Sequence, residues 1–334
     1  MKSIGIIANP ASGKDIRRLV AHATIIDNNE KVNIVKRIIL SAQELGINEI
    51  YIMPDTFNIG FKARDDIFCA KQLKADVYIL DIRLTASLRD TMTAAAMLEK
   101  MSVGCIVSLG GDGTNRAIAK VIKDTPLLPI STGTNNVYPV MLEGTVAGIV
   151  AAVAASGAFD KRRICTKNKR IEIIKNGELL DIALVDAVIC KEAFVGARAI
   201  WSYETISDIV VTKAHPNSIG FSSVAGYIQA IEETDDFGGW VQLGNSGQWV
   251  VAPIAPGIVN QVPIKEMNTI LLDEPKNFCA RENCMIALDG EREIMLKKGD
   301  EVDFVITRNG PYQLDVEKTL KAAMESKFFR KVCI

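Results

Sequence analysis

The chain contains few of the residues that build zinc sites and disulfide scaffolds. Among its 334 residues are 2 histidines and 7 cysteines. Cys279 and Cys284 are the one close pair of cysteines in the sequence, and no second pair accompanies them. An odd, scattered set of cysteines, in a chain whose start lacks the apolar core of a signal peptide, favours reduced thiols in the cytoplasm. A zinc site at this pair is a minor alternative to ordinary thiols.

An excess of charge of either sign is also missing. Lysine plus arginine number 39 and aspartate plus glutamate 40, so the formal net charge is −1. This balance gives no reason to expect a nucleic acid as partner. Uncharged residues 144–159 are too short for the roughly 18–20 residues of a membrane span, and uncharged residues 237–264 are interrupted by prolines. We therefore expect a soluble protein with no membrane partner.

The stretch that organises the chain is VGCIVSLGGDGTNRAIAKV, at residues 103–121. An apolar run leads into Gly110-Gly111-Asp112-Gly113-Thr114, and apolar residues at helical spacing follow, which predicts a buried strand, a glycine-rich turn and a helix. Glycines let the backbone approach a ligand, and the first turn of a helix offers unpaired N–H groups to a phosphate. The loop is not a Walker A motif, which requires G-x-x-x-x-G-K-[ST].

Asp112 distinguishes this loop from a simple phosphate cradle, because a carboxylate repels phosphate. Its presence is explained if it holds Mg²⁺, directly or through water, or takes a proton from an attacking hydroxyl. The loop therefore indicates phosphoryl transfer more than passive dinucleotide binding. On this stretch alone a purely structural strand-to-helix turn stays open as the alternative.

Two further polar loops follow predicted strands. Residues 9–15, Asn-Pro-Ala-Ser-Gly-Lys-Asp, follow a strand at 3–8, and residues 132–136, Thr-Gly-Thr-Asn-Asn, follow a strand at 126–131. Ligands bind parallel sheets beyond the carboxyl ends of the strands, so the three loops are expected to share one phosphate site. The first loop alone also fits the capped start of a helix.

Strands alternate with helices in the first half, which predicts a parallel sheet with helices on both faces. Strands are expected at 3–8, 47–53, 75–82, 105–109 and 126–131, and helices near Ile16 and at 28–45, 66–74, 87–101 and 146–155.

After Asp160 the pattern changes to short strands and tight turns. Residues 161–190 are expected to be strands, with a hairpin turn at Asn176-Gly177, and Asp289-Gly290 is expected to be a second hairpin turn. Residues 212–223 are expected to be a surface connection, with a loop that reaches a substrate as the alternative. The remaining expected elements are strands at 240–254, 268–273, 285–288, 294–296 and 302–307 and a helix at 316–329.

We therefore predict an α/β fold with two domains. Residues 1–145 are expected to form an N-terminal parallel α/β sheet domain that binds nucleotide phosphates. Residues 160–300 are expected to form a mainly antiparallel β domain that binds the substrate.

The motifs together resemble those of the NAD kinase and diacylglycerol kinase superfamily. Its Gly-Gly-Asp-Gly-Thr loop is present at 110–114. The Asn-Pro…Gly and Gly-Thr-x-Asn segments of its lipid-kinase branch match residues 9–13 and 133–136. The run ISTGTNNVYP at 130–139 looks most like the acetoin catabolism protein X family, a predicted ATP-NAD kinase group.

The resemblance implies an NAD kinase-like architecture, with a cleft between the domains and residues 301–334 returning to the first domain. It assigns two catalytic candidates. Asp112 would be a general base or a metal-linked carboxylate, and Glu291, in Asp289-Gly290-Glu291, would be the base of the lipid-kinase branch, with a solvated turn residue as its alternative. The candidate nucleotide-binding residues are Asn9, Pro10, Ser12, Gly13, Gly110, Gly111, Gly113, Thr114, Asn115, Thr132, Gly133, Thr134, Asn135 and Asn136.

The function that we expect is a Mg²⁺-dependent kinase. It would move phosphate from ATP or polyphosphate to a ribose hydroxyl of NAD or a related dinucleotide, and the resemblance suggests a place in acetoin catabolism. The family also implies a homo-oligomer. NAD kinases carry an Asn-Glu pair in the second domain, where this chain has Ala183-Leu184-Val185-Asp186. Two alternatives therefore stay open: a kinase of a lipid or another small alcohol, and a nucleotide-binding sensor without catalysis.

Overall fold

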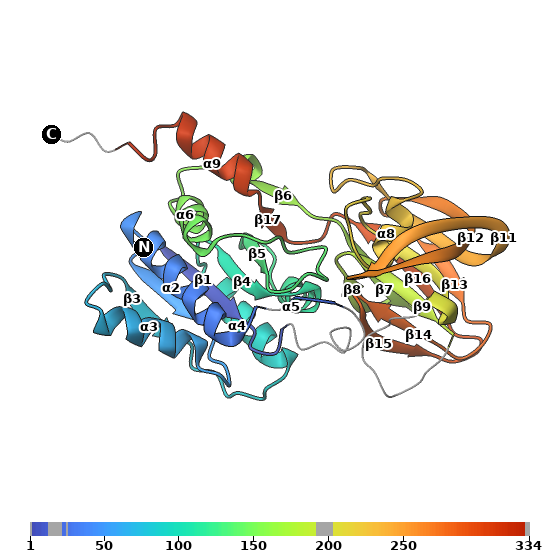
Figure 1. Ribbon diagram of the computed structural model, residues 1–334, viewed down its shortest axis with the longest axis horizontal. Coiled ribbons are helices and arrows are strands. Elements are labelled where there is room, and N and C mark those ends of the chain that lie inside the picture. Colours follow the sequence, from blue (N-terminus) through green and yellow to red (C-terminus); the bar gives the residue numbers. More distant parts are fainter. Residues whose placement is uncertain (1, 13–21, 25, 192–202, 331–334) are drawn as a thin grey trace.

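The computed structural model describes residues 2–12, 22–24, 26–191 and 203–330. In this part of the chain the strands form three sheets. Figure 1 shows most of the helices gathered around one sheet at one end of the molecule, and the other two sheets at the opposite end. The expected helix near Ile16 and the candidate Gly13 lie outside the described residues.

The first sheet has seven described strands in the order β3-β2-β1-β4-β5-β17-β6. The strands from β3 to β5 are mutually parallel, which confirms the predicted parallel sheet. Their neighbour β17 pairs parallel to β5 and antiparallel to β6. The bounds are β1 (Ser3–Ala8), β2 (Glu49–Ile52), β3 (Asp76–Ile79), β4 (Ile106–Gly110), β5 (Leu127–Ser131), β6 (Cys165–Lys167) and β17 (Tyr312–Leu314).

Helices cover both faces of this sheet. Successive side chains of a strand point to opposite faces, so Ile6 of β1 packs with one set of helices and Ile7 with the other. The first set is α2 (Asn28–Glu44), α3 (Ile59–Cys69), α6 (Gly144–Ala155) and the C-terminal α9 (Val316–Glu325). The second set is α4 (Leu88–Lys100) and α5 (Asp112–Ala119).

The other two sheets contain the antiparallel strands of the second half, as predicted. The described strands run β12-β11-β10-β9-β14-β15 in one sheet and β13-β16-β7-β8 in the other. Their bounds are β7 (Arg170–Lys175), β8 (Glu178–Ala183), β9 (Asp186–Cys190), β10 (Ile206–Val211), β11 (Phe237–Ala255), β12 (Ile258–Leu271), β13 (Lys276–Cys279), β14 (Cys284–Leu288), β15 (Glu291–Leu296) and β16 (Glu301–Thr307). The short helices η1 (Tyr203–Thr205) and α8 (Phe221–Gly226) lie between strands of these sheets, whereas α7 (Lys161–Ile164) lies between α6 and β6 of the first sheet.

Both predicted hairpin turns are present. Asn176 and Gly177 have φ angles of 54° and 79°, and Asp289 and Gly290 have φ angles of 50° and 83°. Positive φ at both central residues is the geometry of a type I′ turn, which matches the twist of the flanking strands. The second turn fixes the position of Glu291, the first residue of β15.

Four predicted elements differ from the structure, and one of them is the last helix, expected at 316–329, which is α9 and ends at Glu325. The helix expected at 66–74 is α3, which begins at Ile59 because the Asp55 carboxylate accepts the Ile59 N–H at 2.8 Å. Residues 161–164, expected to be a strand, form α7, since the Asp160 carboxylate accepts the Arg162 N–H at 2.7 Å. The strand expected at 268–273 is the end of the long strand β12, which runs to Leu271.

The C-terminal part of the chain lies beside the first sheet. β17 pairs with β5, and α9 contacts α6 and α7. Figure 1 shows α9 on the same side of the molecule as α6, away from the antiparallel sheets. β16, by contrast, pairs with β13 and β7 of the second half. The domain limits 145, 160 and 300 stay predictions.

Candidate active site

Three strands that lie side by side in the first sheet, β1, β4 and β5, end in the three polar loops. The side-chain amide of Asn9, after β1, donates a hydrogen bond to the Thr114 Oγ1, after β4, at 3.0 Å. The Thr132 hydroxyl, after β5, donates to the Ser12 Oγ at 2.9 Å. The loops therefore form one continuous surface at the carboxyl edge of the sheet, where parallel sheets bind ligands.

The Gly110–Thr114 loop is shorter than its sequence suggests, because α5 already begins at Asp112. Gly111 is the N-cap residue and, as a glycine, has no side chain to accept the N–H groups of the first turn. The missing side chains of two glycines allow other segments to come close to the loop. A Cβ at Gly111 would lie 2.7 Å from Asn136 Oδ1, and one at Gly113 would lie 2.8 Å from Glu291 Oε1. Gly111 and Gly113 thus let two distant segments contact the loop.

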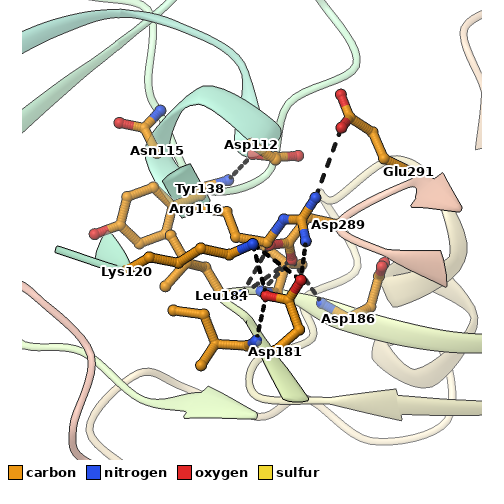
Figure 2. A network of polar contacts seen from close by, with 12 residues as sticks. Asp112, Asn115, Arg116, Lys120, Tyr138, Asp181, Leu184, Asp186, Asp289 and Glu291 are labelled. Atoms are coloured by element: carbon orange, nitrogen blue, oxygen red, sulfur yellow. Dashed lines mark hydrogen bonds and ion pairs between the residues drawn. The ribbon is translucent and has the colours of Figure 1, made fainter. Parts of the chain in front are cut away.

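Asp112 connects the second loop to the third. Its carboxylate accepts the backbone N–H of Tyr138 at 2.8 Å and that of Val137 at 3.1 Å. These bonds hold the segment after Asn136 against the start of α5, and Figure 2 shows the bond to Tyr138.

The third loop presents a mixture of bonded and unbonded polar atoms. The Asn136 amide donates to the Ser131 Oγ at 2.8 Å, and the Thr134 Oγ1 accepts the Thr24 N–H at 3.1 Å. Asn135 Oδ1 is buried and has no hydrogen-bond partner within the described part of the chain. Gly133 is less crowded, since a Cβ there would lie 3.5 Å from the nearest atom, the Thr24 oxygen.

Asn115 faces the interior. Its side chain is fully buried, and its Oδ1 accepts a hydrogen bond from the Ser108 hydroxyl at 2.6 Å. Its amide donates to the Gly111 carbonyl at 2.9 Å. Asn115 thus stabilises the loop from behind. Of the other candidates, Pro10 lies in the turn after β1.

Sequence reasoning missed Lys31, a charged residue of α2 that lies on the same buried face of the helix as Val35 and Ile38, four and seven residues further on. The side chain is fully buried, and its ammonium donates to the Asn9 carbonyl at 2.9 Å, the Ser12 carbonyl at 3.0 Å and the Ser12 Oγ at 2.9 Å. A buried charge is tolerated when it is hydrogen-bonded. Lys31 therefore fixes the first loop from beneath.

Asp289, in the second hairpin turn, has a structural environment. Its carboxylate is buried and accepts backbone N–H groups from Leu184 at 2.9 Å and from Val185 at 2.7 Å. Burial raises the pKa of Asp289 to about 6, although the Arg116 guanidinium and these N–H donors act in the opposite direction. Asp289 joins the hairpin to the connection between β8 and β9.

Arg116 is a second residue that sequence reasoning missed. It lies on α5, is 1% exposed, and reaches carboxylates of Asp181, Asp289 and Glu291 at 3.5, 3.8 and 3.6 Å. Figure 2 shows its guanidinium between these side chains. Lys120, one turn later, pairs with Asp181 at 2.8 Å. The cations of α5 thus face carboxylates of the antiparallel half.

Tyr138 lies beneath the same junction. It is 1% exposed, its hydroxyl donates to the Asn168 Oδ1 at 2.8 Å, and the Lys213 ammonium lies 4.9 Å from its ring centre. Burial, together with Glu233, Asp289 and Asp112, raises the pKa of this phenol well above its ordinary value. Tyr138 is therefore a neutral packing residue at neutral pH.

Other sequence candidates lie apart from this site. Cys279 is exposed and Cys284 buried, and within the described ranges no three His, Cys, Asp or Glu side chains form a group that could hold a metal ion. Across those ranges no helix combines the length and apolarity that crossing a membrane requires. In the segment 212–223, the Thr212 hydroxyl donates to the Leu184 carbonyl at 2.7 Å, and the Gly220 N–H donates to the Pro253 carbonyl at 3.0 Å.

With this geometry in place, comparison with known proteins identifies the family. The family model for the acetoin catabolism protein X C-terminal domain matches residues 169–309, and that for the ATP-NAD kinase N-terminal domain matches residues 4–158. The chain is 34% identical to acetoin catabolism protein X of Cupriavidus necator, across 98% of this chain and 94% of that protein. The chain belongs to the acetoin catabolism protein X family.

More distant relatives connect this family to NAD kinases. The NAD kinase of Chloroflexus aggregans is 26% identical, across 62% of this chain and 71% of that protein. The crystal structure of yeast NADH kinase complexed with NADH superposes with a TM-score of 0.54 at 13% identity, covering 100% of this chain and 89% of that one. The chain therefore has an NAD kinase-like fold, as its motifs predict.

Proposed function

We propose that this protein is a kinase that transfers the γ-phosphoryl group of ATP to a ribose hydroxyl of NAD or a related dinucleotide. One observation carries the proposal: Glu291, from the antiparallel half, lies against Gly113 of the phosphate loop, so that a Cβ there would come within 2.8 Å of its Oε1. A carboxylate from one half thus meets an anion-binding loop of the other. The kinship with NAD kinases supports this substrate class.

The donor site in this proposal is the joined edge of the three loops. The uncapped N–H groups at the start of α5 and the positive end of its dipole favour a phosphate. The Asn9, Ser12 and Thr132 side chains line the neighbouring loops, and Asn135 Oδ1 is an acceptor that an amino or hydroxyl group of the nucleotide would satisfy. Polyphosphate would use the same N–H groups.

Magnesium is proposed to arrive with the nucleotide as Mg·ATP. Mg²⁺ is usually bound by one or two carboxylates together with substrate phosphates and waters, so a protein cage of several acidic ligands is not needed. The described residues are compatible with that pattern, because the carboxylates of Asp112 and Glu291 lie at the loop and no three His, Cys, Asp or Glu side chains of the described ranges form a metal-holding group. The bound ion would neutralise charge on the phosphates.

We assign proton transfer to Glu291 and loop organisation to Asp112. The side chain of Glu291 is 39% exposed, so an acceptor hydroxyl can approach it. The Asp112 carboxylate instead accepts N–H groups of Val137 and Tyr138, which occupy lone pairs that a base would use. A base must lie within hydrogen-bond reach of the proton that it removes, and Glu291 lies at Gly113, beside the loop where the proposed phosphate binds.

In the proposed step the acceptor oxygen forms a bond to the γ-phosphorus as its proton passes to Glu291. The bond between the γ-phosphorus and the oxygen bridging to the β-phosphate breaks, and ADP leaves with that electron pair. The proton on Glu291 is then released to water, so the products are the phosphorylated dinucleotide, ADP and H⁺. Catalysis of this kind depends on positioning and on charge compensation.

The cellular setting is part of the same proposal. ATP and NAD are available in the cytoplasm, and Cys105 and Cys165 are buried free thiols. The name of the relative from Cupriavidus necator suggests a role in acetoin catabolism. Growth on acetoin with and without the gene tests that role: equal growth would contradict it.

The activity is tested with ATP labelled at the γ-phosphate and a panel of acceptors: NAD, NADH, glycerol and a short-chain diacylglycerol. The proposal predicts label on the dinucleotides. Label on diacylglycerol or glycerol alone would replace the dinucleotide with a small-alcohol acceptor. No transfer to any acceptor, with ATP binding retained in a calorimeter, would indicate a nucleotide sensor and contradict the proposal.

A further inference from the structure

We propose that Arg116 is a positioning residue that holds the Glu291 carboxylate at the phosphate loop. This inference rests on the proposed kinase function, because it gives Glu291 its role there. It adds a residue that no motif of the sequence includes.

The first argument is the position of the Glu291 carboxylate against α5. Gly113 and Arg116 are three residues apart on the same helix and therefore lie on the same face. Glu291 Oε1 occupies the space that a Cβ at Gly113 would need, and Glu291 Oε2 lies 3.6 Å from an Arg116 terminal nitrogen. One oxygen of the carboxylate thus faces the glycine, and the other faces the guanidinium.

The second argument is how Arg116 itself is held. Its side chain is 1% exposed, and it also contacts Asp289, which is 0% exposed, and Asp181, which is 12% exposed. Asp289 is fixed in turn by the N–H groups of Leu184 and Val185. A planar guanidinium with a rigid fork of donors keeps a set orientation between such carboxylates. Figure 2 shows Arg116 directed from this buried side toward Glu291.

The three carboxylates differ in what they can do. Those of Asp181 and Asp289 are withdrawn from solvent, whereas Glu291 is 39% exposed. The buried pair therefore orients the guanidinium, and the exposed member faces the space where a substrate would lie. Arg116 acts on the reaction only through Glu291, so its loss should lower kcat and leave the KM for ATP nearly unchanged.

A double-mutant cycle tests this dependence. The four proteins are the parent, Arg116→Lys, Glu291→Gln and the double variant, assayed for NADP formation from NAD and ATP. Lysine keeps the buried charge and removes the fork, so the fold is preserved as far as possible. We expect Arg116→Lys to lower kcat by roughly 10–100-fold in the parent and by less than about 3-fold in the Glu291→Gln background.

Lys120→Gln is the matched control. Lys120 is the C-cap residue of the same helix and pairs at 2.8 Å with Asp181, which Arg116 also contacts, so its loss perturbs the same network. Because Lys120 forms its ion pair with Asp181, its effect on kcat should be equal in the presence and absence of Glu291. Equal, additive losses for Arg116→Lys in both backgrounds would contradict the positioning role and indicate a purely structural one.

Two other outcomes are distinguishable. A parent protein that transfers no phosphate to any acceptor contradicts the proposed function itself, before any variant is compared. If Arg116→Lys fails to fold, as judged by its thermal unfolding, Gly113→Ala displaces Glu291 from the other side. Gly113→Ala should then lower kcat in the parent and not in the Glu291→Gln background. Additive losses in the two backgrounds would contradict the proposal that α5 holds the Glu291 carboxylate.

Discussion

The side-chain amide of Asn9 donates a hydrogen bond of 3.0 Å to the Thr114 hydroxyl, 105 residues further along the chain. This contact joins the loop after β1 to the start of α5, and it brings two of the three sequence motifs into one surface.

Replacing Thr114 with valine tests that contact. Valine keeps the shape and removes the acceptor, so the Asn9 amide loses its partner. A lost hydrogen bond of this kind should reduce the free energy of unfolding by about 1 kcal/mol. If the joined loops bind ATP, its KM should rise by about tenfold at the same time. Urea unfolding and steady-state kinetics measure both. Thr145→Val, at an exposed site on α6, is the control, and equal KM values for the two variants would contradict this role.

Alanine substitutions at Gly113 and Gly111 should change different kinetic parameters. At Gly113 the new methyl group displaces Glu291 and should lower kcat by roughly 10–100-fold. At Gly111 it meets Asn136 Oδ1, at 2.7 Å, and should mainly raise the KM for ATP. Alanine favours helix formation at Gly113, inside α5, whereas at the N-cap position of Gly111 it is less favourable than glycine, so thermal unfolding of both variants accompanies the kinetics. Initial rates over a matrix of ATP and NAD concentrations separate the two parameters, and identical profiles for both variants would refute the assignment.

Lys31→Met should loosen the first loop. The buried ammonium donates to oxygens of Asn9 and Ser12, and methionine leaves those acceptors unsatisfied. One hydrogen bond to a charged group contributes about 1.5–3 kcal/mol to stability. Because Lys31→Met removes several of them, the free energy of unfolding should fall by at least about 2 kcal/mol. The KM for ATP should rise. Lys36→Met on the same helix removes an exposed pair with Asp66 and should change stability by less than about 0.5 kcal/mol. Similar losses in both variants would count against Lys31 as a support of the loop.

Asp289 should make the free energy of unfolding depend on pH. Its pKa is about 6 in the folded chain against 3.8 for an unperturbed carboxyl, so the folded state binds more protons between these values. This group therefore contributes stability that is present below pH 4 and is lost as the pH rises through about 6. Relative to Asp289→Asn, the parent should lose up to about 3 kcal/mol over that interval. Urea titrations at closely spaced pH values measure the difference, and a flat or rising difference would show that burial does not control this carboxyl.

The sequence was sufficient for the parts of the site that depend on local pattern. Gly110 to Thr114 follows an apolar run, and the loops at Asn9 and Thr132 follow their own strands, so the topology of a parallel sheet brought them together as predicted. The hairpin at Asp289-Gly290 was equally clear, because a type I′ turn has a strong residue signature. The start of α3 was missed because the N–H acceptor, Asp55, lies outside the helix.

What the sequence could not supply was the pairing of charges across long separations. Lys31 stands on the buried face of α2 with Val35 and Ile38, and Arg116 looks like an ordinary polar position on α5, but in both cases the sequence does not indicate the partners, which come from other elements. Arg116 reaches Asp181, Asp289 and Glu291, whose distances along the chain carry no periodic signal. The partners of a buried cation can be recognised only after the sheets are placed.

The central claim is a phosphoryl transfer to a dinucleotide with Glu291 as the proton acceptor. The most direct measurement is NADP formation from NAD, ATP and Mg²⁺, followed by an NADP-specific cycling assay, for the parent, Glu291→Gln and Asp112→Asn. The account predicts NADP from the parent and a kcat lower by roughly 10²–10⁴-fold for Glu291→Gln, with little change in the KM for ATP. Asp112→Asn should raise that KM as well, because its carboxylate organises the loop at Val137 and Tyr138. A parent that binds ATP and NAD and makes no NADP, or a Glu291→Gln variant as fast as the parent, would contradict it.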